Sequence, residues 1–182
     1  PFYICEFRAA EAFEIQRMRR QLVNKLEGLS IDCLGNRGVK VLEINLYDLC
    51  IELLMAREGS GEDSRLWDEI LSVEPDVDKD NLQELLQNVL DIQEYLIPAI
   101  AERLHADDFD VLFLSGIGEV FPYIRSHNVL NNLQSTAKDK PTVMFFPGEY
   151  RHSLQQGASL ELFGLLHDDK YYRAFNIFET QV

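Results

Sequence analysis

The chain has 182 residues, 46% of them hydrophobic and 26% charged, which is the profile of an ordinary globular protein rather than a disordered one. Its formal net charge of −14 disfavours binding to nucleic acid, because Lys and Arg drive that association. No apolar run approaches the roughly 18 residues of a membrane-spanning helix, and no signal peptide opens the chain, so we expect no membrane contact.

The length suits one domain, and we expect residues 1–182 to form a single α/β unit. The chain opens with Pro1 directly before an apparent strand, so we expect the full protein to carry a further segment ahead of it. The cysteines, Cys5, Cys33 and Cys50, lack the close spacing of a disulfide framework or a zinc site. We expect them to be buried thiols in a reducing cytoplasm.

The first part of the chain alternates strand and helix patterns. Phe2–Phe7 is an apolar and aromatic run that predicts a strand. Ala9–Leu26 has apolar residues near helical spacing, beginning with Phe13, which predicts a helix. Val39–Leu46 alternates apolar and polar residues as a strand does, and Tyr47–Arg57 returns to a helical pattern.

The middle of the chain begins with a short helix predicted around Leu66–Leu71. A long amphipathic helix is predicted over Asn81–Leu104, in which Pro98 introduces a kink or a division. The nearly continuous apolar run Phe109–Leu114 then predicts a strand buried on both faces, as in a parallel sheet covered by helices. Ser115–Gly118 follows it as a turn.

The last part of the chain is predicted to start with a helix over Glu119–Leu133. Pro141–Phe146 predicts another buried strand, which Pro147-Gly148 ends. Leu160–Leu166 and Tyr171–Phe178 are weaker strand candidates near the C-terminus.

Strands that alternate with helices predict an α/β fold with a mostly parallel sheet between helical layers, in a Rossmann-like or P-loop-NTPase-like frame. Ligands of such sheets bind beyond the carboxyl ends of the strands. Arg8–Ala10, Ser115–Gly118 and Pro147–Tyr150 are expected at that edge. The stretch FRAAEAFE after the first strand lacks the glycines and the lysine of a P-loop, so we predict that the domain does not hydrolyse ATP.

The segment Ser115–Gly118 resembles half of a phosphate-binding glycine loop at the start of a helix. The third glycine of a dinucleotide fingerprint would fall at Phe121, so the match fails. A tight turn between a strand and a helix explains Gly116 and Gly118 better.

The polar residues after this turn form no recognised catalytic set. Ser126 and His127 are neighbours on a predicted helix and point about 100° apart, so they do not form a nucleophile and base pair. Arg125, His127 and Asn131 could instead project polar groups from one helix. A purely structural Arg125, paired with Glu149 or another acidic neighbour, is the alternative.

Two histidines, His105 and His167, each shortly precede a pair of aspartates. Neither has the spacing of a metal motif such as H-E-x-x-H. Turn and capping roles are common where polar residues gather at the ends of elements, so we predict no metal site.

The best candidate for a basic patch is Arg17, Arg19 and Arg20, of which Arg17 and Arg20 would share a helix face. A cluster of this size is typical of a solvated face or of intramolecular salt bridges. We therefore predict no direct nucleic-acid binding by this domain alone.

Four segments, 39–49, 113–133, 143–150 and 162–175, together resemble the BrxB family of bacterial BREX phage-exclusion systems. Their distinctive strings are GxGxxxPxxRSH, FxPGEY and DDxYYRAF, and the resemblance covers nearly the whole chain in the same order. It implies a bacterial cytoplasmic protein that acts in phage restriction alongside a methyltransferase, a large ATPase and PglZ, an alkaline-phosphatase-superfamily protein. It implies a helical segment before the first strand, and it implies no catalytic residues.

The leading hypothesis is a non-enzymatic adaptor, without a cofactor, that docks on PglZ or another BREX protein. The alternatives are a degenerate nucleotide-binding regulatory domain and, third, a metal-dependent nuclease or phosphatase with an unrecognised acidic site. Tyrosine and arginine are favoured at protein interfaces, which directs attention to the sheet edge and the C-terminal segment. The candidate partner- or ligand-binding residues are Gly116, Gly118, Arg125, His127, Gly148, Glu149, Tyr150, Tyr172 and Arg173.

Overall fold

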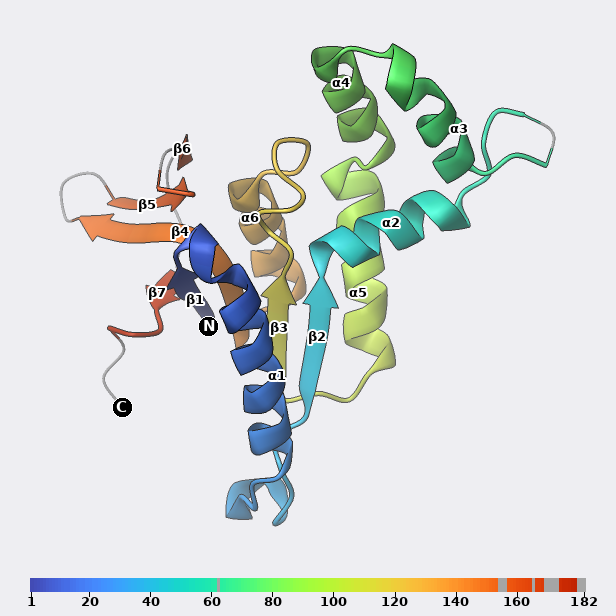
Figure 1. Ribbon diagram of the computed structural model, residues 1–182. Coiled ribbons are helices and arrows are strands. Elements are labelled where there is room, and N and C mark those ends of the chain that lie inside the picture. The colour runs from blue at the N-terminus through green and yellow to red at the C-terminus, as the bar shows by residue number, and fades with distance from the viewer. Residues whose placement is uncertain (62, 154–156, 165, 169–173, 180–182) are drawn as a thin grey trace.

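The computed structural model describes residues 1–61, 63–153, 157–164, 166–168 and 174–179, and Figure 1 shows its arrangement of helices around a sheet. Within these residues, five strands run parallel to one another in the order β2-β3-β4-β1-β7. They are β1 (Phe2–Phe7), β2 (Val41–Asn45), β3 (Val111–Ser115), β4 (Thr142–Ser153) and β7 (Ala174–Asn176). The predicted α/β class and mostly parallel sheet are confirmed, but this is not the 3-2-1-4-5-6 strand order of the Rossmann fold.

Helices cover both faces of the sheet. On one face, Phe113, Val143 and Phe145 are buried beneath α1 (Ala12–Glu27). On the other face, the larger core joins residues such as Phe146 to the remaining helices. Because both faces are covered, β3 and the first half of β4 are almost entirely apolar, as strands of a parallel sheet are.

Helix α1 forms where a helix is predicted, but its apolar residues do not all face the sheet. Ile15, Val23 and Leu26 pack against the cluster beneath it. Phe13 and Met18, by contrast, are exposed. The short 3-10 helices η1 (Ala9–Glu11) and η2 (Asp32–Leu34) precede and follow α1.

Residues 46–106 form the helical arm, which connects β2 to β3 and includes the predicted helices at 47–57 and 66–71. Its elements are α2 (Leu46–Ala56), α3 (Leu66–Val73), η3 (Glu74–Asp76), α4 (Lys79–Val89), η4 (Ile92–Leu96) and α5 (Ile97–Ala106). In Figure 1, α3 and α4 stand away from the sheet, whereas α5 runs back alongside it.

The prediction of a single long helix over Asn81–Leu104 is wrong, because the helix is interrupted near its middle, between α4 and η4. Asp91 starts a new helical segment there, because its carboxylate accepts hydrogen bonds from the Gln93 and Glu94 amides at 2.9 and 2.8 Å. A side chain that caps amides in this way favours a helix start. A second division, between η4 and α5, lies beside Pro98 as the sequence predicted, and Pro98 occupies the first turn of α5, where a proline is tolerated.

The helix predicted over Glu119–Leu133 starts later than expected, as α6 (Ser126–Thr136). The segment before α6 is made largely of turns and contains Pro122. A proline lacks an amide donor and disfavours the helical conformation of the residue before it. The turn at Ser115–Gly118 therefore does not lead directly into a helix.

Strand β4 continues through Pro147-Gly148, where the sequence predicts its end. Its first half pairs with β1 and its second half pairs antiparallel with β5 (Gly157–Leu162), which in turn pairs with β6 (Leu166–Asp168). Gly148 permits this change of partner, because a Cβ atom there would lie 2.1 Å from the Glu161 carbonyl oxygen. The two weaker predicted strands correspond in part to β5 and β6 and to β7.

No helix in the described part of the chain is long and apolar enough to cross a membrane.

At the amino edge of the sheet, Asp110 ties the loop before β2 to the start of β3. Its carboxylate accepts two hydrogen bonds from the Arg37 guanidinium, at 2.6 and 3.0 Å, and one from the Lys40 amide at 2.8 Å. The hydrogen bonds from Arg37 and Lys40 lower the pKa of Asp110 from 3.8 to about 2. The folded protein thus prefers the ionised carboxylate more strongly than the unfolded chain does.

We expect Asp110 to stabilise the fold at neutral pH and to lose this contribution in acid. A carboxyl group with a lowered folded-state pKa contributes fully above its unfolded pKa of about 4, and the contribution fades as the pH falls through about 2. In urea unfolding, Asp110→Asn should be less stable than wild type at pH 7, and the difference should narrow between pH 4 and pH 2. Asp139→Asn is the control, because Asp139 is exposed and lies outside the contacts of Asp110 with Arg37 and Lys40. A difference for Asp110→Asn that stays constant down to pH 2 would contradict this expectation.

Candidate functional site

The carboxyl ends of β1, β2, β3 and the parallel half of β4 meet the start of α1 around a hollow of about 190 Å³, which we call the carboxyl-edge hollow. Its lining consists of Phe7, Ala12, Phe13, Ile15, Gln16, Arg19, Asn45, Ser115, Gly116, Ile117, Glu119, Phe145 and Pro147. This is the place where open α/β sheets bind ligands. Of the segments predicted at this edge, Ser115–Gly118 and Pro147–Tyr150 contribute lining residues and Arg8–Ala10 does not.

Asn45, the last residue of β2, positions the floor of this hollow. Its side-chain oxygen accepts hydrogen bonds from the amides of Tyr47 and Asp48 at 2.9 and 3.3 Å and so caps α2. Gly116 packs directly on this cap, with a φ angle of +79°, and a Cβ atom there would lie 2.2 Å from the Asn45 oxygen. Gly116 is therefore required for a tight turn against α2, although this turn does not lead directly into a helix as the sequence predicted.

The other two candidate glycines also allow close packing. A Cβ atom at Gly118 would lie 2.9 Å from Cγ of Pro147 and 3.1 Å from the ring of Phe163. Gly148 faces the Glu161 carbonyl oxygen of β5, as described above. The structure thus brings Gly118 and the Pro147-Gly148 pair to one edge, where they hold the loops together.

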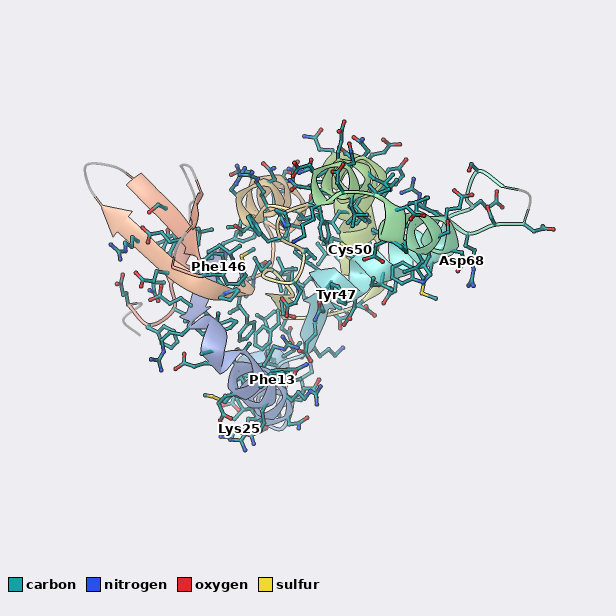
Figure 2. All side chains as sticks on the ribbon, turned by 45° about the horizontal axis from the view of Figure 1, so that its top comes forward. Phe13, Lys25, Tyr47, Cys50, Asp68 and Phe146 are labelled. Atoms are coloured by element: carbon teal, nitrogen blue, oxygen red, sulfur yellow. The ribbon has the colours of Figure 1, made fainter. Side chains whose placement is uncertain are left out.

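One exposed aromatic side chain lines the carboxyl-edge hollow, and two more belong to residues next to its lining residues. Phe13 lines it and is 89% exposed. Phe163, whose amide donates to the Pro147 carbonyl at 2.8 Å, is 40% exposed, and Tyr47, which follows the Asn45 cap, is 43% exposed. Figure 2 labels Phe13 at the start of α1 and Tyr47 at the start of α2, beside the ends of the strands. We call Phe13, Tyr47 and Phe163 the aromatic rim.

Arg125 and His127 lie at the start of α6 and do not line the carboxyl-edge hollow. Exposed Arg125 lines a separate hollow of about 330 Å³ between the helical arm and α6, together with Asp91 and Tyr123. The pairing of Arg125 with Glu149 is not seen, because exposed Glu149 accepts a hydrogen bond from Arg151 at 2.7 Å.

Tyr150 is a core residue, so its assignment as a surface contact is wrong. It is 7% exposed, and its hydroxyl donates a hydrogen bond to the Ala174 carbonyl of β7 at 2.7 Å. Its amide donates to the Glu6 carboxylate at 2.7 Å, and the same carboxylate accepts from the Asn176 side chain at 3.0 Å. The unexpected continuation of β4 carries Tyr150 into this network. Tyr172 and Arg173 lie outside the described residues.

Two arginines of the basic cluster are engaged with acidic side chains. Arg17 pairs with Glu14 at 2.6 Å. Arg19 pairs with Glu43 at 2.9 Å and lies over the Phe145 ring, 5.7 Å from its centroid. These contacts match the intramolecular salt bridges that the sequence favoured over a nucleic-acid patch.

The cysteines are free but not uniformly buried. Cys50 is buried, and burial raises the pKa of its thiol to about 12, so it stays protonated at neutral pH. Cys5 is half-buried, and burial raises its pKa as well. Cys33 is exposed in η2, so the prediction of a buried thiol is wrong there.

Among the residues that the structure describes, no three His, Cys, Asp or Glu side chains gather as a metal site would require. Nδ1 of His105 lies 2.6 Å from the Ala101 carbonyl oxygen, one helical turn earlier, which is a local contact at the end of α5. The side chain of His167 lies outside the described side chains.

Sequence reasoning missed Asn45 and the aromatic rim. Asn45 stands between a strand pattern and a helix pattern, which is the signal of a helix cap, and this signal could have found it. Phe13 follows the helical spacing of the apolar residues of α1, so the sequence does not indicate that its side chain is exposed. Tyr47 and Phe163 acquire their common location only through the fold.

The strand order, the two covered faces and the hollow define an α/β protein that presents a crevice at the carboxyl ends of its strands. The family model described as "BrxB: BREX protein BrxB" matches residues 42–177. A curated "BREX protein BrxB" of Bacillus cereus (strain H3081.97) is 32% identical over 165 residues, which cover 89% of this chain and 77% of the relative. The chain therefore belongs to the BrxB family.

A second relative, "BREX protein BrxB" of Escherichia coli O9:H4 (strain HS), is 24% identical over 176 residues, covering 97% of this chain and 77% of the relative. No solved structure matches the chain with significance. Membership of the family confirms the resemblance and indicates a role in BREX phage defence.

Proposed function

We propose that this protein is a non-enzymatic adaptor in BREX defence and that the carboxyl edge of its sheet docks PglZ or, failing that, another BREX protein. The observation that carries the proposal is the aromatic rim around a small hollow. Phe13, Tyr47 and Phe163 offer large apolar surfaces to solvent from α1, α2 and the turn after β5. Aromatic residues grouped around a pocket are typical of the centres of protein interfaces.

The size of the carboxyl-edge hollow supports a protein partner over a metabolite. Ligand pockets usually enclose about 300–1,000 Å³, whereas this hollow measures about 190 Å³. A single partner side chain fills a volume of that order. The polar groups on its lining, among them Gln16 and Glu119, can orient such a side chain by hydrogen bonds.

A nucleotide-binding regulatory domain has less support. The turn after β3 does not open a helix, so it does not aim a helical N-terminus at the hollow. Gly116 is pressed against the Asn45 cap instead of leaving space for a phosphate. A metal-dependent nuclease or phosphatase has less support too. It needs acidic side chains that converge on a metal ion, and no group of three possible metal ligands is found among the described residues.

The adaptor proposal is tested by co-purification of the protein with PglZ and by calorimetry on the purified pair. We expect a complex that Phe13→Ala weakens by about 2 kcal/mol or more, roughly thirtyfold in affinity. Phe13 is almost fully exposed, so this variant should keep the stability of the wild type. Leu29→Ala is the matched control, because Leu29 is 49% exposed just beyond the other end of α1, about 24 Å from Phe13.

Absence of binding at tens of micromolar protein would remove PglZ as the partner. The same experiment with the other BREX proteins would then decide whether any of them takes its place. If PglZ binds and Phe13→Ala behaves like Leu29→Ala, the partner is right and the docking surface is wrong. Arg125→Ala reports separately on the neighbouring hollow beside α6.

A further inference from the structure

A second docking surface is suggested by a hollow of about 390 Å³ between α2 and α5, which we call the arm groove. Its lining residues on α2 are Leu49, Glu52, Leu53 and Ala56, and those on α5 and just beyond it are Ala99, Glu102, Arg103, Ala106 and Asp107. Within each helix the lining positions follow the spacing i, i+3, i+4, i+7. Each set is therefore one continuous helix face, and the two faces form the walls of the groove.

The walls of the arm groove are largely apolar, and several of their side chains are short. Ala56, Ala99 and Ala106 stand where longer side chains would close the space between the helices. Ala56 and Ala106 are exposed, and Leu53 and Ala99 are half-buried. The groove thus leaves apolar surface of both helices open to solvent and accessible to the apolar face of a third helix.

The rim of the arm groove is acidic. Glu52, Glu102 and Asp107 carry three negative charges, against one positive charge on Arg103, which pairs with Glu52. The helical arm around the groove is also negatively charged. Residues 46–106 contain fifteen Asp and Glu and four Lys and Arg, a net charge of −11 out of −14 for the whole chain.

We propose that the arm groove binds a basic amphipathic helix of a protein partner. An apolar stripe on that helix would cover Leu53 and the alanines, and its Lys and Arg would face the acidic rim. A helix suits the site because it satisfies its own backbone hydrogen bonds while its apolar stripe enters a groove. The inference rests on the proposed adaptor function, since an adaptor needs a second surface besides the carboxyl edge.

The test uses a fluorescein-labelled synthetic peptide of about four helical turns, with Leu at i, i+3, i+4 and i+7 positions and Lys elsewhere. A second peptide with Glu in place of Lys serves as the charge control. Fluorescence anisotropy is measured on the intact protein at about 0.05 and 0.15 M salt. We expect the Lys peptide to bind at micromolar concentration, more weakly at the higher salt, and the Glu peptide not to bind.

Variants of the protein separate the groove from net charge. Ala56→Trp should fill the groove, and Glu102→Lys should reverse one charge of its rim. Each should weaken the Lys peptide at least about tenfold, which corresponds to about 1.4 kcal/mol. Glu84→Lys makes the same charge change at an exposed position of α4 outside the groove, and it should weaken binding less than about twofold. Ala106→Trp replaces Ala56→Trp if that variant does not fold.

Three outcomes would overturn the inference. The first is an absence of binding of the Lys peptide at about 100 µM protein, which would show that the arm groove does not take a basic amphipathic helix. Equal effects of Glu102→Lys and Glu84→Lys, or no effect of the tryptophan variants, would show that net charge alone attracts the peptide. A dimer in sedimentation that Ala56→Trp dissociates would show that a second copy occupies the groove. None of these results changes the outcome of the PglZ experiment, so failure of this inference can be distinguished from failure of the adaptor proposal.

Discussion

Tyr150→Ala is expected to lower the free energy of unfolding by about 3–5 kcal/mol, because it removes a large buried aromatic side chain and leaves a cavity. The same change leaves the buried Ala174 carbonyl without the hydroxyl that donates to it at 2.7 Å. Both effects act where β4 leaves the parallel sheet and β7 joins it. The loss should appear in urea unfolding as a lower midpoint with an unchanged slope.

Tyr150→Phe separates packing from hydrogen bonding. It keeps the ring and removes only the hydroxyl, so it should cost about 0.5–1.5 kcal/mol. Glu149→Ala is the surface control on the adjacent residue and should stay within about 0.5 kcal/mol of wild type. Equal and small effects of all three changes would mean that Tyr150 is not in the core. A partner assay on Tyr150→Ala would mainly report lost folding, not a lost contact.

Gly116→Ala is the second change for which we expect a large effect, about 2–4 kcal/mol of destabilisation. A residue with a Cβ atom pays about 1–2 kcal/mol at a left-handed φ angle such as the +79° of Gly116. The new Cβ atom would also lie 2.2 Å from the Asn45 side-chain oxygen and 2.9 Å from the Leu46 and Tyr47 amide nitrogens. Relief of this clash displaces the cap of α2, which is itself worth about 1 kcal/mol.

Gly35→Ala is the matched control for Gly116→Ala. Gly35 has a similar φ angle of +73°, but nothing lies within 4 Å of the position that its Cβ atom would take. Thermal or urea unfolding should therefore give only the conformational cost, about 1–2 kcal/mol. If the two variants are equally stable, the close approach to Asn45 does not matter. If Gly116→Ala costs more, and the cost falls when Asn45→Ala is added, the clash with the cap is demonstrated.

Short-range patterns of apolar and polar residues predict much of the secondary structure. The apolar run of β3 and the helical spacing of α2 predicted their elements to within a few residues. The failures have local causes that compete with periodicity. Asp91 divides the expected long helix, because a cap can start a helix inside a continuous amphipathic pattern. Pro122 delays α6 for the opposite reason, since it prevents a helix where the pattern would allow one.

The sequence predicted the location of the candidate site but not the residues that form it. Ser115–Gly118 lies at the carboxyl edge of the sheet, as the sequence predicted, and lines a hollow there. That a partner binds at this edge stays a prediction. The candidate residues differ from one another in their structural roles. Gly116 serves close packing, Tyr150 serves the core, and Arg125 lies beside another hollow. Residue type alone does not distinguish an interface tyrosine from a core tyrosine, because both combine an apolar ring with a polar hydroxyl.

The sequence by itself determined the α/β class, the covered parallel sheet, the absence of a P-loop after β1 and the family, since each depends on residue types and their spacing along the chain. Only the tertiary structure decided the aromatic rim and the arm groove. Phe13, Tyr47 and Phe163 lie on three segments far apart in the sequence, and the walls of the groove come from helices about fifty residues apart. Exposure and proximity of these residues depend on which elements pack together. The periodicity of apolar residues within a single element does not predict that packing.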